Sequence, residues 1–433
     1  MNISRFIARR ITFQGSKGFA KIIMNIGTVA VALAVTVMIV STSLFKGFND
    51  QVSNKVFDFW GHIHISDSNT KRTFEAIPIE HDQDLIDRLQ GLGPQTYNST
   101  RSFDWFGYGE EFKAKETRGS IKNISPFIIL PAIIDTRKEF EGMYMRGLTK
   151  DYDWSRLDNY LKDGRWLNFD DVSSYTEIVL SEYTSKRLDR KVGDKIIVNF
   201  ILEGRQIPKR MDVVGIYGTG IEEYDKQFAI LDMSILQDAL DWKEGEVAGY
   251  EVILEHAEDM ALWNEYIYIE ELPSRLYSET IREKFDNIFA WLGLQAINEN
   301  VIFLLMIIVA IITMITTYLI LILERTKTIG ILKSLGATNG NVVGIFLYCA
   351  AYIISKGMLI GNILGLSLCF LQKQFKFIKL DEANYLIDSA PIAFDLPAII
   401  LINVGVLVVT LIFLLIPSLL ISRIKPVKIL RFN

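Results

Sequence analysis

Residues 301–323 read VIFLLMIIVAIITMITTYLILIL, and these 23 residues contain no charged side chain. A helix needs roughly 20 apolar residues to cross the hydrocarbon core of a bilayer. Three further runs are long enough, namely residues 22–45, 342–371 and 398–422. Because lipid offers backbone amides no outside partner, each run should be a helix. The sequence therefore predicts an α-helical membrane protein with four transmembrane helices, not a large soluble core.

The first run, residues 22–45, could be mistaken for a signal peptide, because arginines precede it and Ala32-Leu33-Ala34 is similar to a cleavage site. Its 24 uncharged residues exceed the roughly 7–15 residues of a signal h-region, and the apolar stretch continues past that tripeptide. We therefore expect this run to be a retained membrane anchor.

Charged residues around the spans predict the orientation of the chain. Residues 1–21 carry five basic residues and no acid, and residues 423–433 carry four basic residues and no acid. Residues 324–341 carry three basic residues and one acid, whereas residues 46–299 carry 30 basic and 46 acidic residues. Cytoplasmic loops hold the excess of lysine and arginine, so both termini and residues 324–341 should be cytoplasmic. Basic residues that flank spans also differ from the basic stripe of a nucleic-acid-binding domain.

These features predict a multi-pass membrane protein with a large extracytoplasmic domain between the first and second spans. A cytoplasmic amphipathic helix should precede the first span, because Phe6, Ile7, Ile11 and Phe13 recur at helical spacing among arginines. In order, the predicted parts are residues 1–21, 22–45 (first span), 46–299 (extracytoplasmic domain), 300–323 (second span), 324–341, 342–371 (third span), 372–397, 398–422 (fourth span) and 423–433.

The extracytoplasmic domain mixes short strands with short helices, which predicts an α+β fold. Ser181 should cap a helix that runs to Leu188, and residues 277–294 should form a helix that leads into the second span. The two cysteines of the chain, Cys349 and Cys369, lie in the third span, so this domain should fold without disulfides. Alternating or β-branched runs predict strands at residues 62–65, 177–180, 195–200 and 211–216, with a hairpin tip at 202–208.

No motif marks an active site. The chain has no Walker-type phosphate loop, so it should not itself hydrolyse nucleotide, and it has no zinc-protease motif. His62 and His64 lie two residues apart on an expected strand and could in principle hold a metal. With only His81 and His256 elsewhere, ordinary surface histidines are the simpler interpretation. The sequence therefore predicts neither an enzyme nor a metal site.

The segment between the second and third spans, residues 324–338, reads ERTKTIGILKSLGAT. Ile329, Leu332 and Leu335 fall on one side of a short helix that Gly336 should end. A short amphipathic helix between two spans needs a surface to pack against. The membrane surface and a groove in another protein both satisfy this need, and the residues alone do not choose between them.

This segment resembles the junction typical of the FtsX-like (MacB-type) ABC transporter permease family, and the chain is similar to its lipoprotein-releasing (LolC/LolE-type) branch. The resemblance extends over most of the chain, and its pieces occur in the family's order. Near the C-terminus it includes Pro417, Pro426, Leu430 and Arg431. The earlier pieces are FIARR at 6–10, FKGF at 45–48, MRGL at 145–148, GRWL at 164–167, EIVLSE at 177–182, KVGDK at 191–195, VVGIY at 213–217 and EYD at 223–225.

The resemblance implies a location in a bacterial inner membrane with the large domain in the periplasm. It also implies a MacB-like periplasmic core fold for that domain and a coupling helix that seats in a separate ABC ATPase subunit (LolD-like). That subunit would bind ATP and Mg²⁺, so no cofactor is expected in this chain. Thr328 stands where the family usually has glutamate, so one polar contact to the ATPase differs or is replaced. The implied coupling residues are Glu324, Arg325, Lys327, Ile329, Gly330, Ile331, Leu332, Lys333, Leu335 and Gly336.

The resemblance also implies a second permease subunit, identical or different, and lipoprotein cargo that enters between the first and second spans. Gly27, Ala30 and Ala34 form a row of small residues on the first span, which should pack against another span or a second subunit. The residues expected to face cargo or lipid are Val37, Val40, Ser41 and Leu44.

A charged residue interrupts the third span. Lys356 lies within the third apolar run, before Gly357, where a charge costs about 3 kcal/mol unless it is paired or reaches the interface. The helix could tilt or break there so that Lys356 reaches the inner interface, or Lys356 could face the bundle.

In the resembling branch a hairpin engages a periplasmic carrier protein, and the corresponding hairpin here is shorter. Its residues are Leu202, Glu203, Gly204, Arg205, Gln206, Ile207 and Pro208.

Two other functions remain compatible with this sequence. One is a scaffold like the cell-division member of the family, in which ATPase cycles bend the ectodomain and activate a periplasmic hydrolase. The other is a MacB-like permease that exports a peptide or drug with a periplasmic adaptor. The long ectodomain favours lipoprotein release over the scaffold, because the cell-division branch usually has a smaller domain.

Overall fold

The computed structural model describes residues 19–70, 77–99, 113–136, 139–169, 176–202, 205–381 and 385–423. The amphipathic helix expected before the first span therefore lies outside the described residues, apart from its last three positions. The chain divides into two compact units. The membrane unit comprises Met1–Gln51, Ala290–Lys379 and Ser389–Asn433, and the β-rich unit comprises Val52–Phe289 and Leu380–Asp388.

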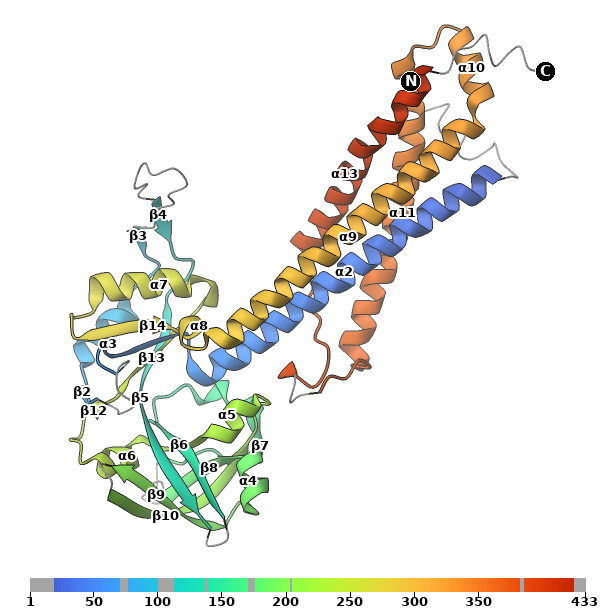
Figure 1. Cartoon of the computed structure of the whole chain (residues 1–433). Helices are drawn as coiled ribbons and strands as arrows, with labels where there is room; N and C mark the ends of the chain where they lie inside the picture. The colour runs from blue at the N-terminus through green and yellow to red at the C-terminus, as the bar shows by residue number, and fades with distance from the viewer. Residues whose placement is uncertain are drawn as a thin grey trace. The chain divides into compact units, whose positions relative to one another are not determined.

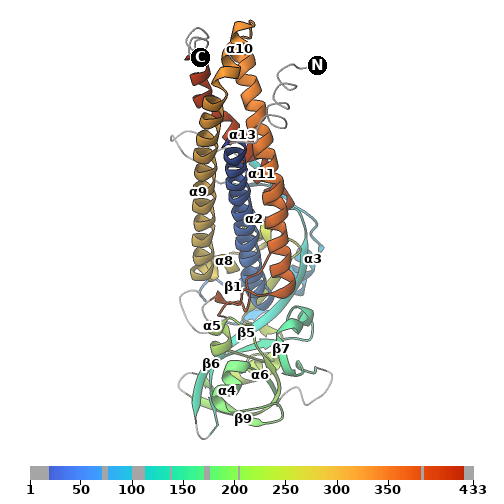
Figure 2. The same ribbon diagram turned by 90° about the vertical axis from the view of Figure 1, so that its right-hand side faces the viewer.

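Four helices among the described residues are long and apolar enough to cross a membrane, as the sequence predicts. They are α2 (Phe19–Trp60), α9 (Asp286–Glu324), α11 (Asn339–Phe375) and α13 (Leu396–Arg423). The short helix α10 (Thr326–Ser334) joins α9 to α11. In the membrane unit these helices run side by side as a bundle (Figure 2).

Helix α2 continues 15 residues beyond the predicted end of the first span, through Trp60. Lys46, Asn49 and Asp50 interrupt the apolar run, yet Val52 and Trp60 on the following turns are almost completely buried. The helical periodicity of apolar residues thus outlasts the apolar run, because the last turns of α2 pack into the core of the β-rich unit rather than into lipid.

Six strands of the β-rich unit close on themselves (Figure 1). The long strand β5 pairs with β6 and, through its last four residues, with β9, so neighbouring strands form a ring. A closed ring leaves none of its members as an unpaired edge. In ring order the strands are β5 (Ile121–Asp135), β6 (Phe140–Leu148), β11 (Phe228–Asp232), β8 (Glu177–Ser181), β10 (Arg205–Tyr217) and β9 (Lys195–Leu202).

The first half of β5 extends into a second, antiparallel layer. There β13 (Gly249–Leu254) pairs with β5 and with β1 (Ile63–Asp67), and β1 pairs with β14 (Leu276–Thr280). β7 (Leu161–Gly164) pairs with β10, and two small ladders lie apart. The remaining strands and helices are β2 (Ile79–Glu80), β3 (Thr96–Ser99), β4 (Lys113–Glu116), β12 (Glu246–Val247), α3 (Gln83–Gly91), α4 (Glu182–Leu188), α5 (Glu222–Gln227), α6 (Met233–Leu240), α7 (Met260–Tyr266) and α8 (Ile281–Lys284).

Local sequence signals were informative in this unit. Ser181 caps α4, and its hydroxyl accepts the Thr184 amide at 3.0 Å, as predicted. The helix expected over residues 277–294 is wrong at its start, because residues 277–280 belong to β14 and pair with β1. Thr280 then forms a capping box with Glu283, so helix begins only at Ile281.

Candidate functional site

The four spans hold together through close contacts between α2 and α11. Gly357, Gly361 and Gly365 recur every fourth residue on α11 and face α2. A Cβ atom added to Gly361 would lie 2.7 Å from the Ala32 carbonyl oxygen, and one added to Gly357 would lie 2.8 Å from that of Thr28. Only glycine permits this approach of two backbones, which is how helices associate in lipid without a hydrophobic driving force.

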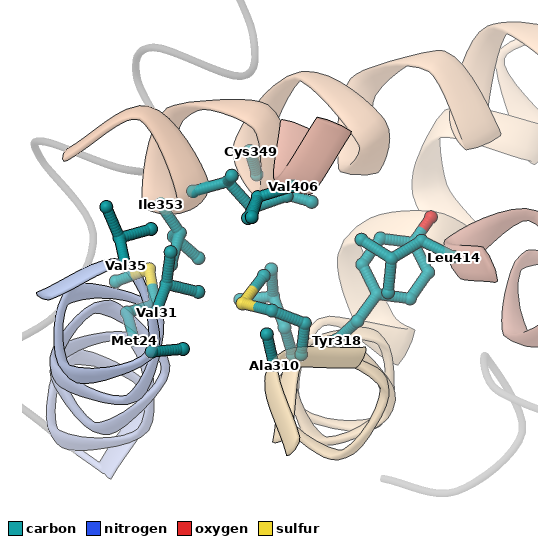
Figure 3. Close-up of a cluster of buried hydrophobic side chains, with 14 of the residues drawn as sticks. Met24, Val31, Val35, Ala310, Tyr318, Cys349, Ile353, Val406 and Leu414 are labelled. Atoms are coloured by element: carbon teal, nitrogen blue, oxygen red, sulfur yellow. The ribbon is translucent and has the colours of Figure 1, made fainter. Parts of the chain in front are cut away.

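Helix α2 also packs against α9. A Cβ atom added to Gly27 would lie 2.8 Å from the Thr317 hydroxyl oxygen, and Ala34 is almost completely buried. The small-residue row on α2 therefore packs within this chain, which is the first of the two partners expected for it. Figure 3 shows the apolar side chains that fill the core of the bundle, among them Met24, Val31, Val35, Ala310, Tyr318, Cys349, Ile353, Val406 and Leu414.

A reciprocal amide pair joins α11 to α13. Asn362 donates to the Asn403 carboxamide oxygen at 2.6 Å, and Asn403 donates back at 3.0 Å. Each side chain also donates to a carbonyl one turn earlier on its own helix, Met358 or Ile399. The pair thus satisfies its own polar groups within lipid and fixes the register of the two helices.

The outward face of α2 carries an apolar stripe that is longer than the sequence predicts. Ile22, Ile26, Val29 and Leu33 are 56–64% exposed and follow a spacing of four, three and four residues. The predicted residues continue this stripe, and all four are half-buried: Val37, Val40, Ser41 and Leu44. The i, i+4, i+7, i+11 spacing could have indicated the first half of the stripe from sequence.

Helix α9 presents a second apolar face. Its exposed residues recur at helical spacing along the span, while Ala310, Met314 and Tyr318 of the same helix are buried in the bundle. The bundle therefore leaves apolar faces on both the first and the second spans. Between residues 301 and 312 the exposed residues of α9 are Val301, Leu304, Leu305, Ile308, Val309 and Ile312.

The expected coupling segment forms α10, and Gly336 ends it with a φ of +93°. Its apolar residues do not share one face as the sequence suggested. Ile329 is fully buried among the spans and Leu332 packs partly against them, whereas Ile331 is 51% and Leu335 is 79% exposed. Because Ile329 packs against the chain's own bundle, it does not belong to the surface that could contact a partner protein.

The other expected coupling residues are arranged around the same helix. Gly330 is buried beside Ile329, while Arg325 and Lys333 are half-buried. The exposed remainder consists of Glu324, Lys327 and Gly336. Together with Ile331 and Leu335, they form a mixed apolar and charged surface at the end of the bundle.

Lys356 lies in an unbroken α11, so the break considered at Gly357 does not occur. Its side chain is exposed on the outward face of the helix and does not point into this chain's bundle. Gly357 contacts Thr28 and Val31 of α2, which lie seven to ten residues beyond Lys21. At 1.5 Å per residue, Lys356 is therefore about 10–15 Å from the charged start of the first span. A lysine side chain that points back along its helix shortens this distance further.

The hairpin expected at residues 202–208 is present in the β-rich unit. β9 and β10 pair up to Leu202 and Arg205, and Gln206, Ile207 and Pro208 continue the ladder. Glu203 and Gly204 lie outside the described residues.

A buried ion pair lies where α2 ends in the β-rich unit. Arg146 is completely buried, and its Nη2 lies 2.6 and 2.8 Å from the two Glu251 oxygens. The guanidinium carbon lies 4.6 Å from the ring centre of Phe59 and 4.9 Å from that of Trp60. Burial alone would lower the pKa of Arg146, but Glu251 raises it, so the guanidinium stays charged.

His62, just before β1, and His64 on β1 are not the surface residues that the sequence suggested. His64 is fully buried; its Nε2 donates to the Trp60 carbonyl at 2.8 Å, and its Nδ1 accepts from Lys284 at 3.0 Å. His62 Nδ1 accepts the Leu254 amide at 3.0 Å. Burial lowers the pKa of His62 to about 3 and that of His64 well below its ordinary value. Both imidazoles are therefore neutral and structural, and no metal-ligating cluster occurs among the described residues.

Comparison with protein families agrees with this architecture. The family described as MacB-like periplasmic core domain matches residues 26–267, which is more than half of the chain. The family described as FtsX-like permease C-terminal matches residues 300–426, which include α10, α11 and α13.

Similar proteins cover nearly the whole chain at low identity. The lipoprotein-releasing system transmembrane protein LolE of Haemophilus influenzae is 23% identical over 99% of both chains. Proteins named LolC from Neisseria meningitidis and Xylella fastidiosa are each 22% identical over 96% of this chain and 95% of their own. The extracellular domain of the noncanonic ABC-type transporter YknZ aligns with 50% of this chain and 98% of its own, at 12% identity and a TM-score of 0.30. The chain therefore belongs to the FtsX-like, MacB-type family of ABC transporter permeases.

Proposed function

We propose that this protein is a permease subunit of a lipoprotein-releasing complex of the bacterial inner membrane, with both termini in the cytoplasm. It would extract acylated proteins from the membrane for transfer toward the outer membrane. A second permease subunit and a separate ATPase of the LolD type would complete the complex. ATP and Mg²⁺ would be bound by that ATPase.

The apolar stripe on α2 is the observation that carries this proposal. Ile26, Val29 and Leu33 are exposed although the opposite side of the same helix packs tightly against α9 and α11. An acyl chain on such a face gains about 0.8 kcal/mol for each buried CH₂ group. Cargo held in this way leaves only when energy is supplied, which fits a permease driven by an ATPase. The relatives named for lipoprotein release support the same cargo at low identity.

The surface of α10 suits the ATPase. Ile331 and Leu335 are exposed at the end of the bundle, on a segment that also exposes the basic Lys327. Replacing Leu335 by Asp would place a carboxylate in an apolar contact, which is unfavourable without a partner. We expect Leu335→Asp to lose the co-purified ATPase, whereas Lys243→Asp in the β-rich unit should retain it. An ATPase retained at full stoichiometry would mean that α10 lies on lipid instead.

Photo-crosslinking from the stripe tests the transport proposal directly. A crosslinking residue at Leu33, Val37 or Val40 should capture lipoprotein when nucleotide is absent and lose it when ATP closes the bundle. Leu401 on α13 is a matched control, because it is 72% exposed but lies outside the stripe. Crosslinks only between permease subunits at all three sites, unchanged by nucleotide, would favour the scaffold function instead. Equal lipoprotein capture from Leu401 would mean that cargo contacts the bundle without a preferred face.

A further inference from the structure

The end of α11 opposite α10 carries a segment whose composition differs from its surroundings. Residues 373–379 read KQFKFIK, so three lysines alternate with large apolar residues. Phe375 is 69%, Phe377 58% and Ile378 44% exposed, and Lys373, Lys376 and Lys379 are exposed as well. Such a surface on a soluble domain would be a liability, so it calls for a partner.

The three lysines lie within seven residues at the end of the bundle opposite α10. Most other basic residues that flank the spans lie at the α10 end, which holds Arg325, Lys327 and Lys333, and Lys46 is the exception. The loop that follows the lysines carries Asp381, Glu382, Asp388 and Asp395, of which Asp395 pairs with Lys46. Within the part of the chain that the structure describes, neither Lys376 nor Lys379 forms an ion pair, and Lys373 lies over the Phe394 ring at 5.5 Å. These cations are therefore available to an anionic partner outside the chain.

The segment is held in place by a buried glutamine. Gln372 is 3% exposed; its carboxamide oxygen accepts the Ile378 amide at 3.0 Å, and its nitrogen donates to the Ala390 carbonyl at 2.9 Å. Lys376 adopts a left-handed conformation, with a φ of +45°, and ends α11. The segment thus folds back over the end of the span in a defined geometry.

The contacts of α11 with α2 give the depth of the segment. Gly365 lies beside Thr36 and Ile39 of α2, which runs parallel to α11 in this region. Seven further residues along each helix, about 10 Å at 1.5 Å per residue, reach Gln372 on α11 and the level of Lys46 on α2. Lys46 ends the first apolar run and pairs with Asp395, just before α13, at 2.5 Å. Residues 373–379 therefore lie at the level where the spans leave the hydrocarbon.

We propose that residues 373–379 form a binding site for anionic phospholipids in the leaflet at this end of the bundle. Phe375, Phe377 and Ile378 insert among the upper acyl carbons, and the three lysines bind the phosphate groups. Aromatic side chains favour the membrane interface, and each lysine near an anionic surface adds about 1 kcal/mol, which is about fivefold in local enrichment. The site goes beyond cargo transport and requires only that the chain spans a membrane.

Lipid-specific quenching tests this site in the full-length chain. Phe377→Cys is labelled with bimane in a Cys349→Ala/Cys369→Ala background and placed in nanodiscs of phosphatidylcholine with a fraction of phosphatidylglycerol. The nitroxide quencher sits near the headgroup of either one lipid or the other. We expect quenching by labelled phosphatidylglycerol to exceed that by labelled phosphatidylcholine at least fivefold. Replacing Lys373, Lys376 and Lys379 by Gln should remove this preference and leave quenching by both lipids.

Two controls make the result decisive. Bimane at Tyr268, an exposed aromatic position of the β-rich unit, reports the background. Replacing Lys186, Lys195 and Lys243 by Gln removes the same charge from exposed positions of the β-rich unit and should leave the preference intact. If quenching at Phe377 is no greater than at Tyr268, the segment does not contact the membrane and the proposal is overturned. A bimane that a second protein shields from both lipid quenchers would overturn it as well. Equal quenching by both lipids, unaffected by the lysines, would overturn the anionic site.

Discussion

Removing the charge of Glu251 should destabilise the β-rich unit more than any surface substitution. Glu251 is the acidic partner of Arg146, and both side chains are completely buried. The structure gives Arg146 Nε and Nη1 no hydrogen-bond partner among the described residues, because the guanidinium lies between aromatic rings. Glu251→Leu therefore leaves a buried cation with little compensation.

The expected loss follows from the burial of this pair. Removing one partner of a buried ion pair costs about 3–5 kcal/mol, because the remaining charge stays out of water. Since 1.4 kcal/mol is a factor of ten, amides that exchange through opening of this unit should exchange between about a hundredfold and a few thousandfold faster. Replacing both partners, as in Arg146→Met/Glu251→Leu, should recover most of the stability, because no charge is then buried.

Hydrogen exchange of the full chain in detergent measures this effect on peptides from β6 and β13, which carry the two residues. Glu258→Leu is a matched control, because Glu258 pairs with Arg118 at 2.5 Å while both side chains are about 70% exposed. An exposed pair contributes little, so these peptides should exchange almost as in the original chain. The reasoning fails if Glu251→Leu behaves like Glu258→Leu, or if the double variant is as unstable as the single one.

Three further predictions concern helix packing, pH and orientation. Gly361→Leu should dissociate α2 from α11 and lower the melting temperature in detergent, since its Cβ would lie 2.7 Å from the Ala32 carbonyl oxygen. Gly405→Leu is the control, because a Cβ there would have no atom within 4 Å. Equal melting temperatures of the two variants would refute the packing argument. The pKa of His62 in the folded chain is about 3, so between about pH 6.5 and pH 3 the unfolded chain binds a proton that the folded chain does not. The stability present above pH 6.5 therefore falls by up to about 1.4 kcal/mol per pH unit as acid is added. In His62→Gln the urea midpoint should depend less on pH between pH 7 and 5, and an unchanged pH dependence would contradict this prediction. Cysteines at Asn69 and Asp241 should react with an impermeant thiol reagent in intact spheroplasts, and labelling of a cysteine at Asn339 would reverse the proposed orientation.

The spans were predictable because their signal is local. An uncharged run such as residues 301–323 has one stable conformation in lipid, whatever surrounds it. The end of α2 was not predictable in this way, since Trp60 is buried against Tyr224, Phe228 and Phe285, which come from distant parts of the sequence. Closure of the strand ring was unpredictable for the same reason. Ala132 pairs with Phe200, and the sequence around one of these residues contains no information about the other.

The sequence likewise predicted the spacing of the site residues but not the neighbours against which they pack. Helical spacing placed Val37, Val40 and Leu44 on one stripe, but it could not say how far the stripe extends or which neighbour covers the other faces. On α10 the periodicity grouped Ile329 with Leu335, although the first packs into the bundle and the second is exposed. Rotation of a short helix is set by what it packs against, and a period of 3.6 residues contains no information on that neighbour.

The pairing of β1 has a consequence for synthesis of this protein. β1 follows α2 directly, yet Ile63 pairs with Val252 and Thr280, about 190 to 220 residues later in the chain. At roughly 5–20 residues per second of synthesis, β1 emerges roughly 10–40 s before its first partner strand exists. During that interval the apolar Ile63 and Ile65, both fully buried in the finished domain, stand uncovered on a nascent chain already anchored by its first span. A chaperone at the membrane surface would find its earliest substrate there.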